Sequence, residues 1–182
     1  MTREVPDTVR GRAAKVRLVL MDADGVLTDG RIIVFADGNE ARAYNARDGL
    51  GVRMGQSGGL DFGIVSGRSS PAVEARAREL DFVEIHQRVA AKGDCVAEIA
   101  RRRRLSLEEV CFVGDDIVDV PALRKCGLAV APADADPEVF AHVHHVGASE
   151  GGRGIVREVV ELILRARESW ERVVSPYLGG KE

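Results

Sequence analysis

One stretch of the chain limits the possible folds more than any other. Leu18–Met21 is continuously apolar, and it is followed at once by Asp22-Ala23-Asp24-Gly25. A short apolar run bounded by charges and a glycine-containing loop is typical of a strand buried on both faces of a parallel sheet. Two carboxylates directly after such a strand are costly unless a cation or a reaction uses them. Asp-Gly is also a common turn former, but a turn needs only one acid, so we favour a functional interpretation.

Short apolar runs alternate with helical patterns along the rest of the chain. Further strands are predicted at Phe62–Val65, Phe82–Ile85, Val110–Val113, Leu128–Val130 and His144–Val146. Helices are predicted at Asp48–Ser57, Pro71–Leu80, Gly93–Arg104, Val118–Cys126 and Ile155–Trp170. This alternation predicts an α/β fold with a doubly wound, Rossmann-like, mostly parallel sheet covered by helices on both faces. Asp48 is placed to cap the first of these helices. The tail, from about residue 171 to 182, is expected to be irregular.

A β-hairpin interrupts the alternation at about residues 31–44. Two β-prone runs flank Asp37-Gly38, which is a turn sequence. The first run, Arg31–Phe35, is apolar on successive residues rather than on alternate ones. A two-stranded ribbon with apolar side chains on both faces is not stable alone. We therefore expect the hairpin to pack on another subunit.

Composition limits the class of protein. The chain has 182 residues, 45% of them hydrophobic, and a formal net charge of −3. These values predict one globular domain over residues 1–182 and give no electrostatic reason to expect nucleic acid as a partner. No stretch has the length of a membrane span, and no signal peptide is expected at the N-terminus. The three cysteines lie in apolar segments without metal-ligand spacing, which suggests a reducing, cytoplasmic location.

Polar groups follow four of the predicted strands. They are Asp22 with Asp24, Ser66, Lys92, and Asp115 with Asp116 and Asp119. Strand ends of an open α/β sheet meet at one edge, where ligands bind. Carboxylates without Cys or His are hard oxygen ligands and suit Mg²⁺, while a lysine and a hydroxyl suit phosphoryl oxygens. Asp22 is then a candidate nucleophile, and Asp24 a candidate for protonating the leaving oxygen and activating water.

The same segments resemble the four ordered motifs of the haloacid dehalogenase-like (HAD) phosphatases. They are Asp22–Thr28, Ser66-Gly67-Arg68, Lys92-Gly93 and Gly114–Asp119. The resemblance covers about residues 15 to 168 and implies a HAD-like fold and hydrolysis of a phosphomonoester through an aspartyl-phosphate.

The resemblance also implies a role for each residue. Asp22 would be the nucleophile and Asp24 the general acid/base. The phosphoryl group would be bound by Ser66, Gly67 and Lys92. Magnesium would be held by the Asp22 carboxylate, the Asp24 backbone carbonyl and Asp115. Asp116 would lie at or near the ion, and Asp119 would orient Lys92.

More narrowly, the chain is similar to the capless (C0) branch of this family, which includes phosphatases of 3-deoxy-D-manno-octulosonate 8-phosphate (KDO 8-phosphate) in lipopolysaccharide biosynthesis. The matching segments are Asp29-Gly30 with the hairpin, Asp48–Gly51, Asp119–Pro121 and Gly151–Glu158. The branch implies a homotetramer in which hairpins pack together. It also implies that a tail such as Leu178-Gly179-Gly180 can reach a neighbouring site.

The substrate is less strongly indicated than the reaction. A sugar acid carries a carboxylate, for which the guanidinium of Arg68 is a suitable partner. The branch also suggests substrate contacts at Asp48 and Gly49. The alternatives are a nonulosonate 9-phosphate or another small sugar phosphate. Arg153 and Arg157 are weaker candidates for substrate contact.

A non-enzymatic alternative is a receiver-like phosphoacceptor domain, which also combines Mg²⁺, aspartates and a lysine at strand ends. The late position of Asp115 and Asp116 and the presence of Asp24 argue against it. Two other clusters are discounted. The cations at Arg101–Arg104 end a predicted helix, where positive charge is favourable, and alternate strand positions keep His142, His144 and His145 from sharing one face.

Overall fold

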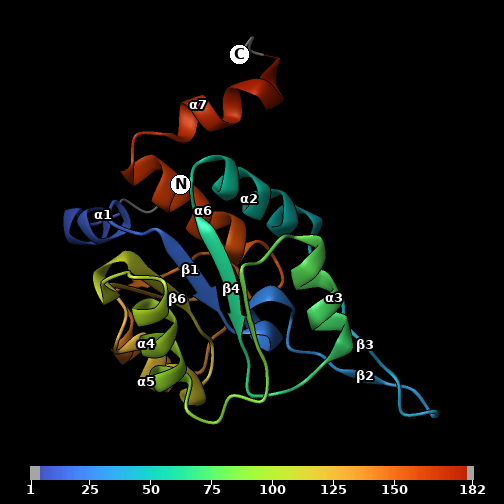
Figure 1. Ribbon diagram of the computed structural model, residues 1–182. Coiled ribbons are helices and arrows are strands. Elements are labelled where there is room, and N and C mark those ends of the chain that lie inside the picture. The colour runs from blue at the N-terminus through green and yellow to red at the C-terminus, as the bar shows by residue number, and fades with distance from the viewer. Residues whose placement is uncertain (1–4, 180–182) are drawn as a thin grey trace.

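The computed structural model describes residues 5–179. A sheet of six parallel strands runs through its centre in the order β5-β4-β1-β6-β7-β8 (Figure 1). The strands are β1 (Leu18–Met21), β4 (Asp61–Val65), β5 (Glu84–His86), β6 (Val110–Val113), β7 (Leu128–Ala131) and β8 (His145–Val146). This arrangement confirms the predicted α/β fold class.

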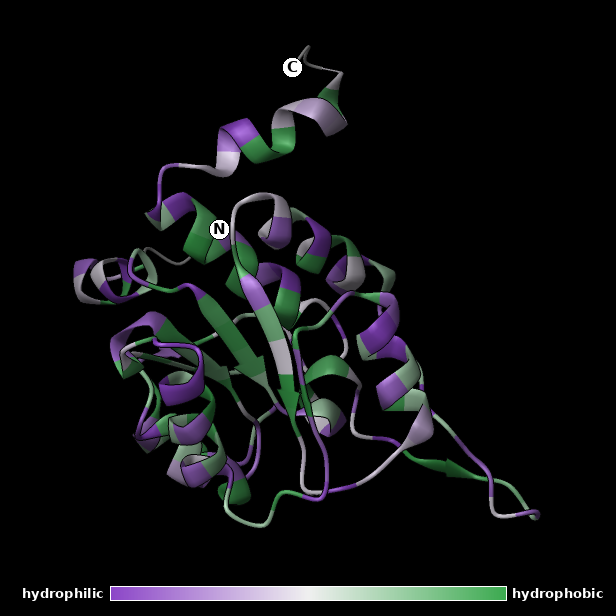
Figure 2. Cartoon of the chain, in the orientation of Figure 1, coloured by the Kyte–Doolittle hydropathy of each residue, from purple (hydrophilic) through white to green (hydrophobic). Residues whose placement is uncertain are grey.

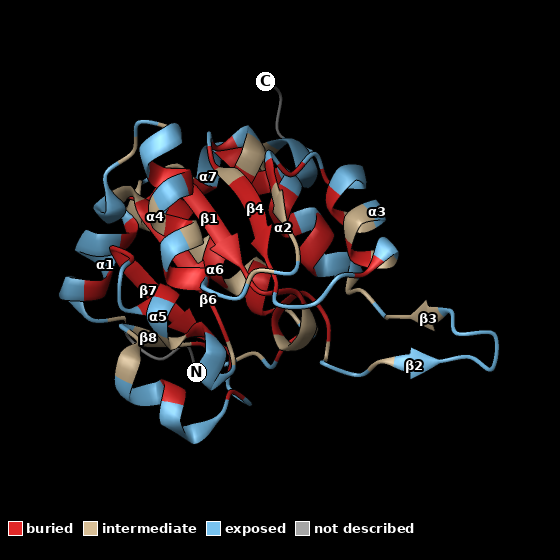
Figure 3. Cartoon of the chain, turned by 60° about the horizontal axis from the view of Figure 1, so that its bottom comes forward, coloured by how far each residue is buried: buried red, intermediate tan, exposed pale blue. Residues whose placement is uncertain are grey.

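Helices cover both faces of the sheet. They are α1 (Asp7–Ala13), α2 (Ala46–Ser57), α3 (Pro71–Glu79), α4 (Lys92–Arg102), α5 (Val120–Leu123), α6 (Ile155–Ala166) and α7 (Trp170–Val174). Apolar residues of α4 and α5 pack on one face, and those of the other five helices join the core on the opposite face. The central strands β4, β1, β6 and β7 are mostly apolar and are buried between these layers (Figures 2 and 3).

Strand β1 shows how the sequence specifies two cores. Leu18 and Leu20 belong to the cluster under α4 and α5, while Val19 and Met21 belong to the cluster on the other face. Successive side chains of a strand point to opposite faces, so a strand with helices on both sides must be apolar at every position. The fully buried run Leu18–Met21 meets that requirement.

Helices α2 and α6 approach each other closely. A Cβ on Gly51 of α2 would lie 2.8 Å from the Arg157 Cα of α6, a distance that no side chain tolerates. Glycine at this position therefore lets the two backbones meet. The contact matters for the site because the loop preceding α6 packs beneath the loop that follows β1: a Cβ on Gly151 would collide with the Gly25 carbonyl oxygen.

The predicted hairpin is present as an antiparallel pair, β2 (Ile33–Val34) and β3 (Glu40–Ala41), shorter than the predicted runs. It projects away from the rest of the chain (Figures 1 and 3). Ile33, Val34 and Phe35 expose 56%, 65% and 53% of their surface. These exposures are high for large apolar side chains, as the sequence pattern indicated.

Several predicted boundaries are wrong. Helix α2 begins at Ala46 with Asn45 as its N-cap, not at Asp48. The predicted helix Val118–Cys126 is a 3₁₀ turn, Ile117–Asp119, followed by the short α5. The predicted final helix Ile155–Trp170 ends at Ala166, and Glu168 adopts a positive φ of 54° before α7 begins. The tail is helical as far as Leu178, and residues 180–182 of the predicted tail lie outside the described residues.

Within residues 5–179, none of the helices is both long enough and apolar enough to cross a membrane.

Candidate active site

The polar residues predicted to share an edge lie at the carboxyl ends of neighbouring strands. Asp22 directly follows β1, Ser66 follows β4, Lys92 begins α4 after β5, and Asp115 lies two residues beyond β6. Because β4, β1 and β6 are parallel neighbours, these residues all emerge at the same edge of the sheet.

Lys92 joins two of the predicted carboxylates. Its Nζ lies 3.0 Å from Asp22 Oδ2 and 2.6 Å from Asp119 Oδ1. All three side chains are buried or nearly so, with Lys92 at 3% and Asp119 at 0% residue exposure. A buried ammonium is tolerated only when it is paired, and here two carboxylates pair it. Burial lowers the pKa of Lys92, but Asp119 and Asp22 outweigh that effect and raise it.

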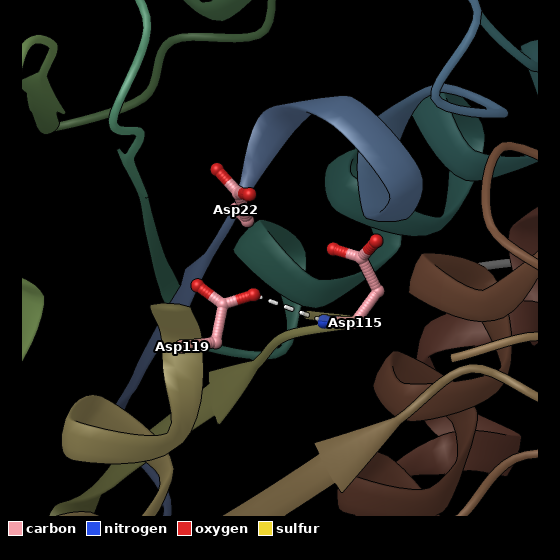
Figure 4. Close-up of side chains that lie close together, drawn as sticks. All are labelled: Asp22, Asp115 and Asp119. Atoms are coloured by element: carbon pink, nitrogen blue, oxygen red, sulfur yellow. Dashed lines mark hydrogen bonds between the residues drawn. The ribbon is translucent and has the colours of Figure 1, made fainter. Parts of the chain in front are cut away.

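Asp119 positions this group. Its Oδ2 accepts a hydrogen bond from the backbone amide of Asp115 at 3.0 Å (Figure 4) and another from the amide of Asp116 at 3.3 Å. Its other oxygen holds Lys92, so both carboxylate oxygens have partners within the fold. This geometry agrees with the orienting role implied for Asp119 by the family resemblance.

Burial and mutual repulsion disfavour the ionised forms of the acidic side chains. Burial, followed by the charge of Asp119, raises the pKa of Asp22 to about 6, although Lys92 opposes the shift. Burial and then the charges of Asp119, Asp22 and Asp116 raise the pKa of Asp115 to about 8. Shifts of this kind cluster where carboxylates are brought together for chemistry or for a cation.

The arrangement fits a divalent cation with a preference for oxygen ligands. Asp22, Asp115 and Asp119 each offer a carboxylate oxygen, and these three oxygens lie within 4.8 Å of one another (Figure 4). The buried Oδ1 of Asp115 has no hydrogen-bond partner, whereas both Asp119 oxygens are occupied. Asp22 and Asp115 are therefore better placed than Asp119 as ligands. An all-oxygen set with two carboxylates suits Mg²⁺.

The loop after β1 brings backbone to this cluster. Residues Ala23–Leu27 form a π-helical turn that is interrupted at Asp24 and Gly25, and Gly25 has a φ of 95°. A Cβ on Gly25 would stand 2.0 Å from Asp115 Oδ2. Only glycine permits both the backbone angle and this close approach. The Gly25 backbone thus lies beside Asp115. A metal-ligand role for the neighbouring Asp24 carbonyl stays a prediction.

The Asp24 side chain lies apart from the lysine cluster and is held by arginines. Arg42, which directly follows β3, donates from Nε to Asp24 Oδ1 at 2.7 Å and from Nη2 to Oδ2 at 3.3 Å. Arg68 Nε lies farther away, 3.8 Å from Asp24 Oδ2. The sequence did not single out Arg42. It is one of 26 Lys and Arg residues, and its contact with Asp24 depends on the tertiary fold.

The predicted phosphate and substrate residues after β4 are placed as follows. Ser66 is buried, and its Oγ accepts a hydrogen bond from the Arg68 amide at 3.3 Å. Gly67 is exposed. The Arg68 side chain is 54% exposed and contacts Glu40 Oε1 at 3.2 Å, so it lies at the surface near Asp24. Beyond β6, the predicted site residue Asp116 is exposed, and its side chain caps the turn that begins at Ile117.

Asp48 has a structural role. Its side chain is completely buried, and it accepts hydrogen bonds from the amides of Gly154 at 3.1 Å and Arg157 at 2.8 Å. It therefore satisfies backbone donors at the start of α6. Gly49 is buried beside Arg76, since a Cβ there would lie 2.5 Å from Arg76 Nη2. Substrate contacts at Asp48 and Gly49 stay predictions.

Replacing Asp48 tests whether this residue stabilises the fold or contacts the substrate. Asp48→Ala removes a buried cap, so we expect the free energy of unfolding to fall by about 1–2 kcal/mol, measured by denaturant titration. If the role is structural, KM for the phosphoester substrate should change less than about twofold. A large rise in KM with unchanged stability would instead support substrate contact.

The discounted clusters have local partners. Arg102 and Arg103 pair with the buried Glu84. His144 Nδ1 accepts a hydrogen bond from the Ala129 amide at 2.9 Å. These contacts give Arg102, Arg103 and His144 local structural roles.

Known proteins share this architecture over nearly the whole chain. The model of the haloacid dehalogenase-like hydrolases matches residues 53–127. The 3-deoxy-D-manno-octulosonate 8-phosphate phosphatase KdsC of Yersinia pestis is 39% identical over 167 residues, which are 92% of this chain and 89% of that protein.

Solved structures agree with the sequence comparison. A probable YrbI family phosphatase from Pseudomonas syringae superposes with a TM-score of 0.94 at 36% identity, covering 97% of this chain and 100% of that one. The Moraxella catarrhalis 3-deoxy-D-manno-octulosonate 8-phosphate phosphatase, solved with magnesium, phosphate and KDO, has a TM-score of 0.91 at 31% identity, covering 93% and 97% of the two chains. The chain belongs to the haloacid dehalogenase-like hydrolase family, in the branch that contains the 3-deoxy-D-manno-octulosonate 8-phosphate phosphatases.

Proposed function

We propose that this protein is a Mg²⁺-dependent phosphatase that hydrolyses KDO 8-phosphate to KDO and phosphate. The observation that carries the proposal is the placement of Asp22 between Lys92 and Asp115 at the carboxyl edge of the sheet. A nucleophilic carboxylate, a buried cation and a second, partnerless carboxylate are the groups that phosphoryl transfer to aspartate requires. Relatives with this fold are named for the same activity.

The first step transfers the phosphoryl group to the protein. A carboxylate oxygen of Asp22 attacks phosphorus, and the bond between phosphorus and the sugar oxygen breaks. Asp24 donates a proton to that oxygen, which leaves as an alcohol. With a pKa of about 6, Asp22 is mostly ionised at neutral pH, as attack requires.

The second step regenerates the protein. Asp24, now ionised, removes a proton from water as the water oxygen attacks phosphorus. The bond between phosphorus and Asp22 breaks, and inorganic phosphate is released.

The surrounding groups balance charge. Lys92 and Ser66 bind oxygens of the phosphoryl group in our proposal, with the Gly67 amide beside them. Asp22, the Asp24 carbonyl and Asp115 would hold Mg²⁺, which would supply further positive charge so that a dianionic phosphate can approach a carboxylate. Asp119 keeps Lys92 directed at this point.

Arg68 is our candidate for recognising the carboxylate of the sugar acid. It is exposed beside Asp24, where the leaving group must lie, and its planar guanidinium matches a carboxylate. A nonulosonate 9-phosphate also carries a carboxylate and is the main alternative substrate.

Phosphate release with Mg²⁺ from KDO 8-phosphate, a nonulosonate 9-phosphate and hexose phosphates tests the assignment. We expect the highest kcat/KM for KDO 8-phosphate. Arg68→Ala should reduce kcat/KM for KDO 8-phosphate and for the nonulosonate 9-phosphate by about 10- to 100-fold. The charge-assisted pair between the guanidinium and the substrate carboxylate is lost in this variant. The hexose phosphates, which lack the carboxylate, should show almost no change. Equal losses for all substrates would remove Arg68 as the specificity residue.

We also propose that the whole chain, residues 1–182, forms one phosphatase domain, that it is cytoplasmic and that it assembles as a homotetramer through the hairpin. The exposed side chains of Ile33, Val34 and Phe35 support the assembly. Such a group of large apolar side chains on a two-stranded ribbon is favoured only if another surface covers it.

A charge in the hairpin tests the assembly. Val34→Asp should dissociate the oligomer, because burying an unpaired carboxylate in an apolar contact costs several kcal/mol. Light scattering measures the mass. The matched control is Val83→Asp, at an apolar residue that is 47% exposed outside the hairpin, and it should leave the mass unchanged. An unaltered mass for Val34→Asp would contradict the proposed interface.

A further inference from the structure

The side chain proposed as general acid/base is held by a residue that lies outside the four motif segments named from the sequence. We propose that Arg42 is a positioning residue for Asp24. The inference rests on the role given to Asp24 in the proposed function. It concerns how the carboxyl group is held at the place where it must reach the leaving oxygen.

The contact is bidentate. Nε and Nη2 of Arg42 meet the two oxygens of Asp24 at 2.7 and 3.3 Å. Two nearly parallel hydrogen bonds from a planar guanidinium fix both the position and the rotation of a carboxyl group, which a single contact does not do. The second arginine nearby, Arg68, has its Nε 3.8 Å from one oxygen and a half-exposed side chain, so it restrains Asp24 much less.

Arg42 is itself held rigidly. Its side chain has no exposed surface. The remaining terminal nitrogen, Nη1, donates to Glu40 Oε2 and to Ser70 Oγ, both at 2.9 Å. Glu40 belongs to β3, and Ser70 is a buried residue at the start of α3. The guanidinium therefore has partners on three sides, and a side chain fixed in this way can orient another.

The arrangement separates two carboxyl groups that are only two residues apart. Asp22 is directed toward Lys92 and Asp115, while Asp24 is directed toward Arg42. A nucleophile and a general acid must act on opposite ends of the same bond, so they need different orientations. Lys92 sets one of these orientations and Arg42 sets the other. A displacement of about 1 Å at such a group can reduce a rate by about 100-fold.

The first test uses leaving-group chemistry. Arg42→Gln keeps a polar side chain but loses the bidentate pair and the charge. For a sugar phosphate, whose leaving oxygen needs a proton, we expect kcat to fall by about 10- to 100-fold with KM changed by less than about twofold. Arg42→Lys keeps the charge without the fork, so it should recover only part of the loss.

With 4-nitrophenyl phosphate the first step needs no proton, because nitrophenolate is a good leaving group. The variant should therefore release one nitrophenolate per site rapidly and then turn over slowly, as the second step still needs Asp24 to activate water. Intact-protein mass spectrometry during this phase should find the phosphorylated chain. A merely structural role for Arg42 would slow both phases alike and give no burst.

A double-mutant cycle completes the test. If Arg42 acts through Asp24, then Arg42→Gln should have almost no further effect on kcat in the Asp24→Asn background. The matched control is Arg78→Gln on α3, at a residue whose side chain is 71% exposed, and it should behave like the wild type. Additive losses in the cycle, or an unchanged kcat in Arg42→Gln, would overturn the inference. Absence of phosphatase activity in the wild type would instead overturn the proposed function.

Discussion

Asp22→Asn is expected to abolish turnover, with kcat at least about 10⁴-fold below that of the wild type. The variant keeps the shape of the side chain but loses the oxygen nucleophile, so no aspartyl-phosphate can form. Phosphate release from KDO 8-phosphate under saturating Mg²⁺ measures the effect, and no phosphorylated protein should be trapped.

The same change should leave the fold intact. Burial and the charge of Asp119 raise the pKa of Asp22, which means that its ionised form is disfavoured in the folded protein. Lys92 retains Asp119 as a partner at 2.6 Å when Asp22 is replaced. We therefore expect the Tm of Asp22→Asn at pH 8 without Mg²⁺ to equal or exceed that of the wild type. The control Asp94→Asn, at an exposed aspartate on α4, should retain full activity. Appreciable turnover by freshly prepared Asp22→Asn would contradict its assignment as the nucleophile.

The parts of the fold that the sequence predicted best are those set by local pattern. Strand β6 begins and ends where its apolar run does, at Val110 and Val113. The break between α6 and α7 was missed because the apolar stripe continues across it to Trp170, which is buried, and no glycine or proline marks the turn at Glu168. Helix α1 was missed because only Val9 and Ala13 within it are buried, too few to give a visible period.

The same distinction applies to the site. Asp22, Lys92 and Asp115 were predictable because parallel strands bring their ends to one edge, so sequence order alone implies that these residues are neighbours. Arg42 and Asp48 were not predictable in this way. Arg42 contacts a carboxylate 18 positions earlier through the path of a hairpin, and Asp48 contacts amides more than 100 positions later. Such contacts depend on how layers pack, which residue pattern does not encode locally.

Asp115→Asn is expected to preserve or raise the stability of the fold without Mg²⁺ while it lowers activity. Burial and three neighbouring carboxylates raise the pKa of Asp115 from 3.8 to about 8. Between these two values the folded state holds a proton that the unfolded state has lost, so stability falls as pH rises from about 4 to about 8. Asparagine carries no such proton and removes this penalty. Without Mg²⁺, the variant should therefore melt at or above the wild-type temperature at pH 8.

With Mg²⁺ present, we expect the wild type to gain more stability than Asp115→Asn. Mg²⁺ binds the ionised form of Asp115, so at a pH below about 8 binding must release the proton of that carboxyl group. The affinity of the wild type for Mg²⁺ should therefore increase as pH rises from 6 to 8. At 100 times Kd the ion stabilises the fold by about 2.7 kcal/mol, a rise in Tm of several degrees that should be smaller at pH 6 than at pH 8 for the same Mg²⁺ concentration. Asp115→Asn should lose most of this rise and at least about 100-fold in kcat/KM, because it lacks an anionic ligand. Asp94→Asn should keep both. If Asp115→Asn retained the full Mg²⁺-dependent rise in Tm, the ion would have to bind elsewhere, and the carboxylates at the end of β1 and β6 would need another explanation for their unfavourable proximity.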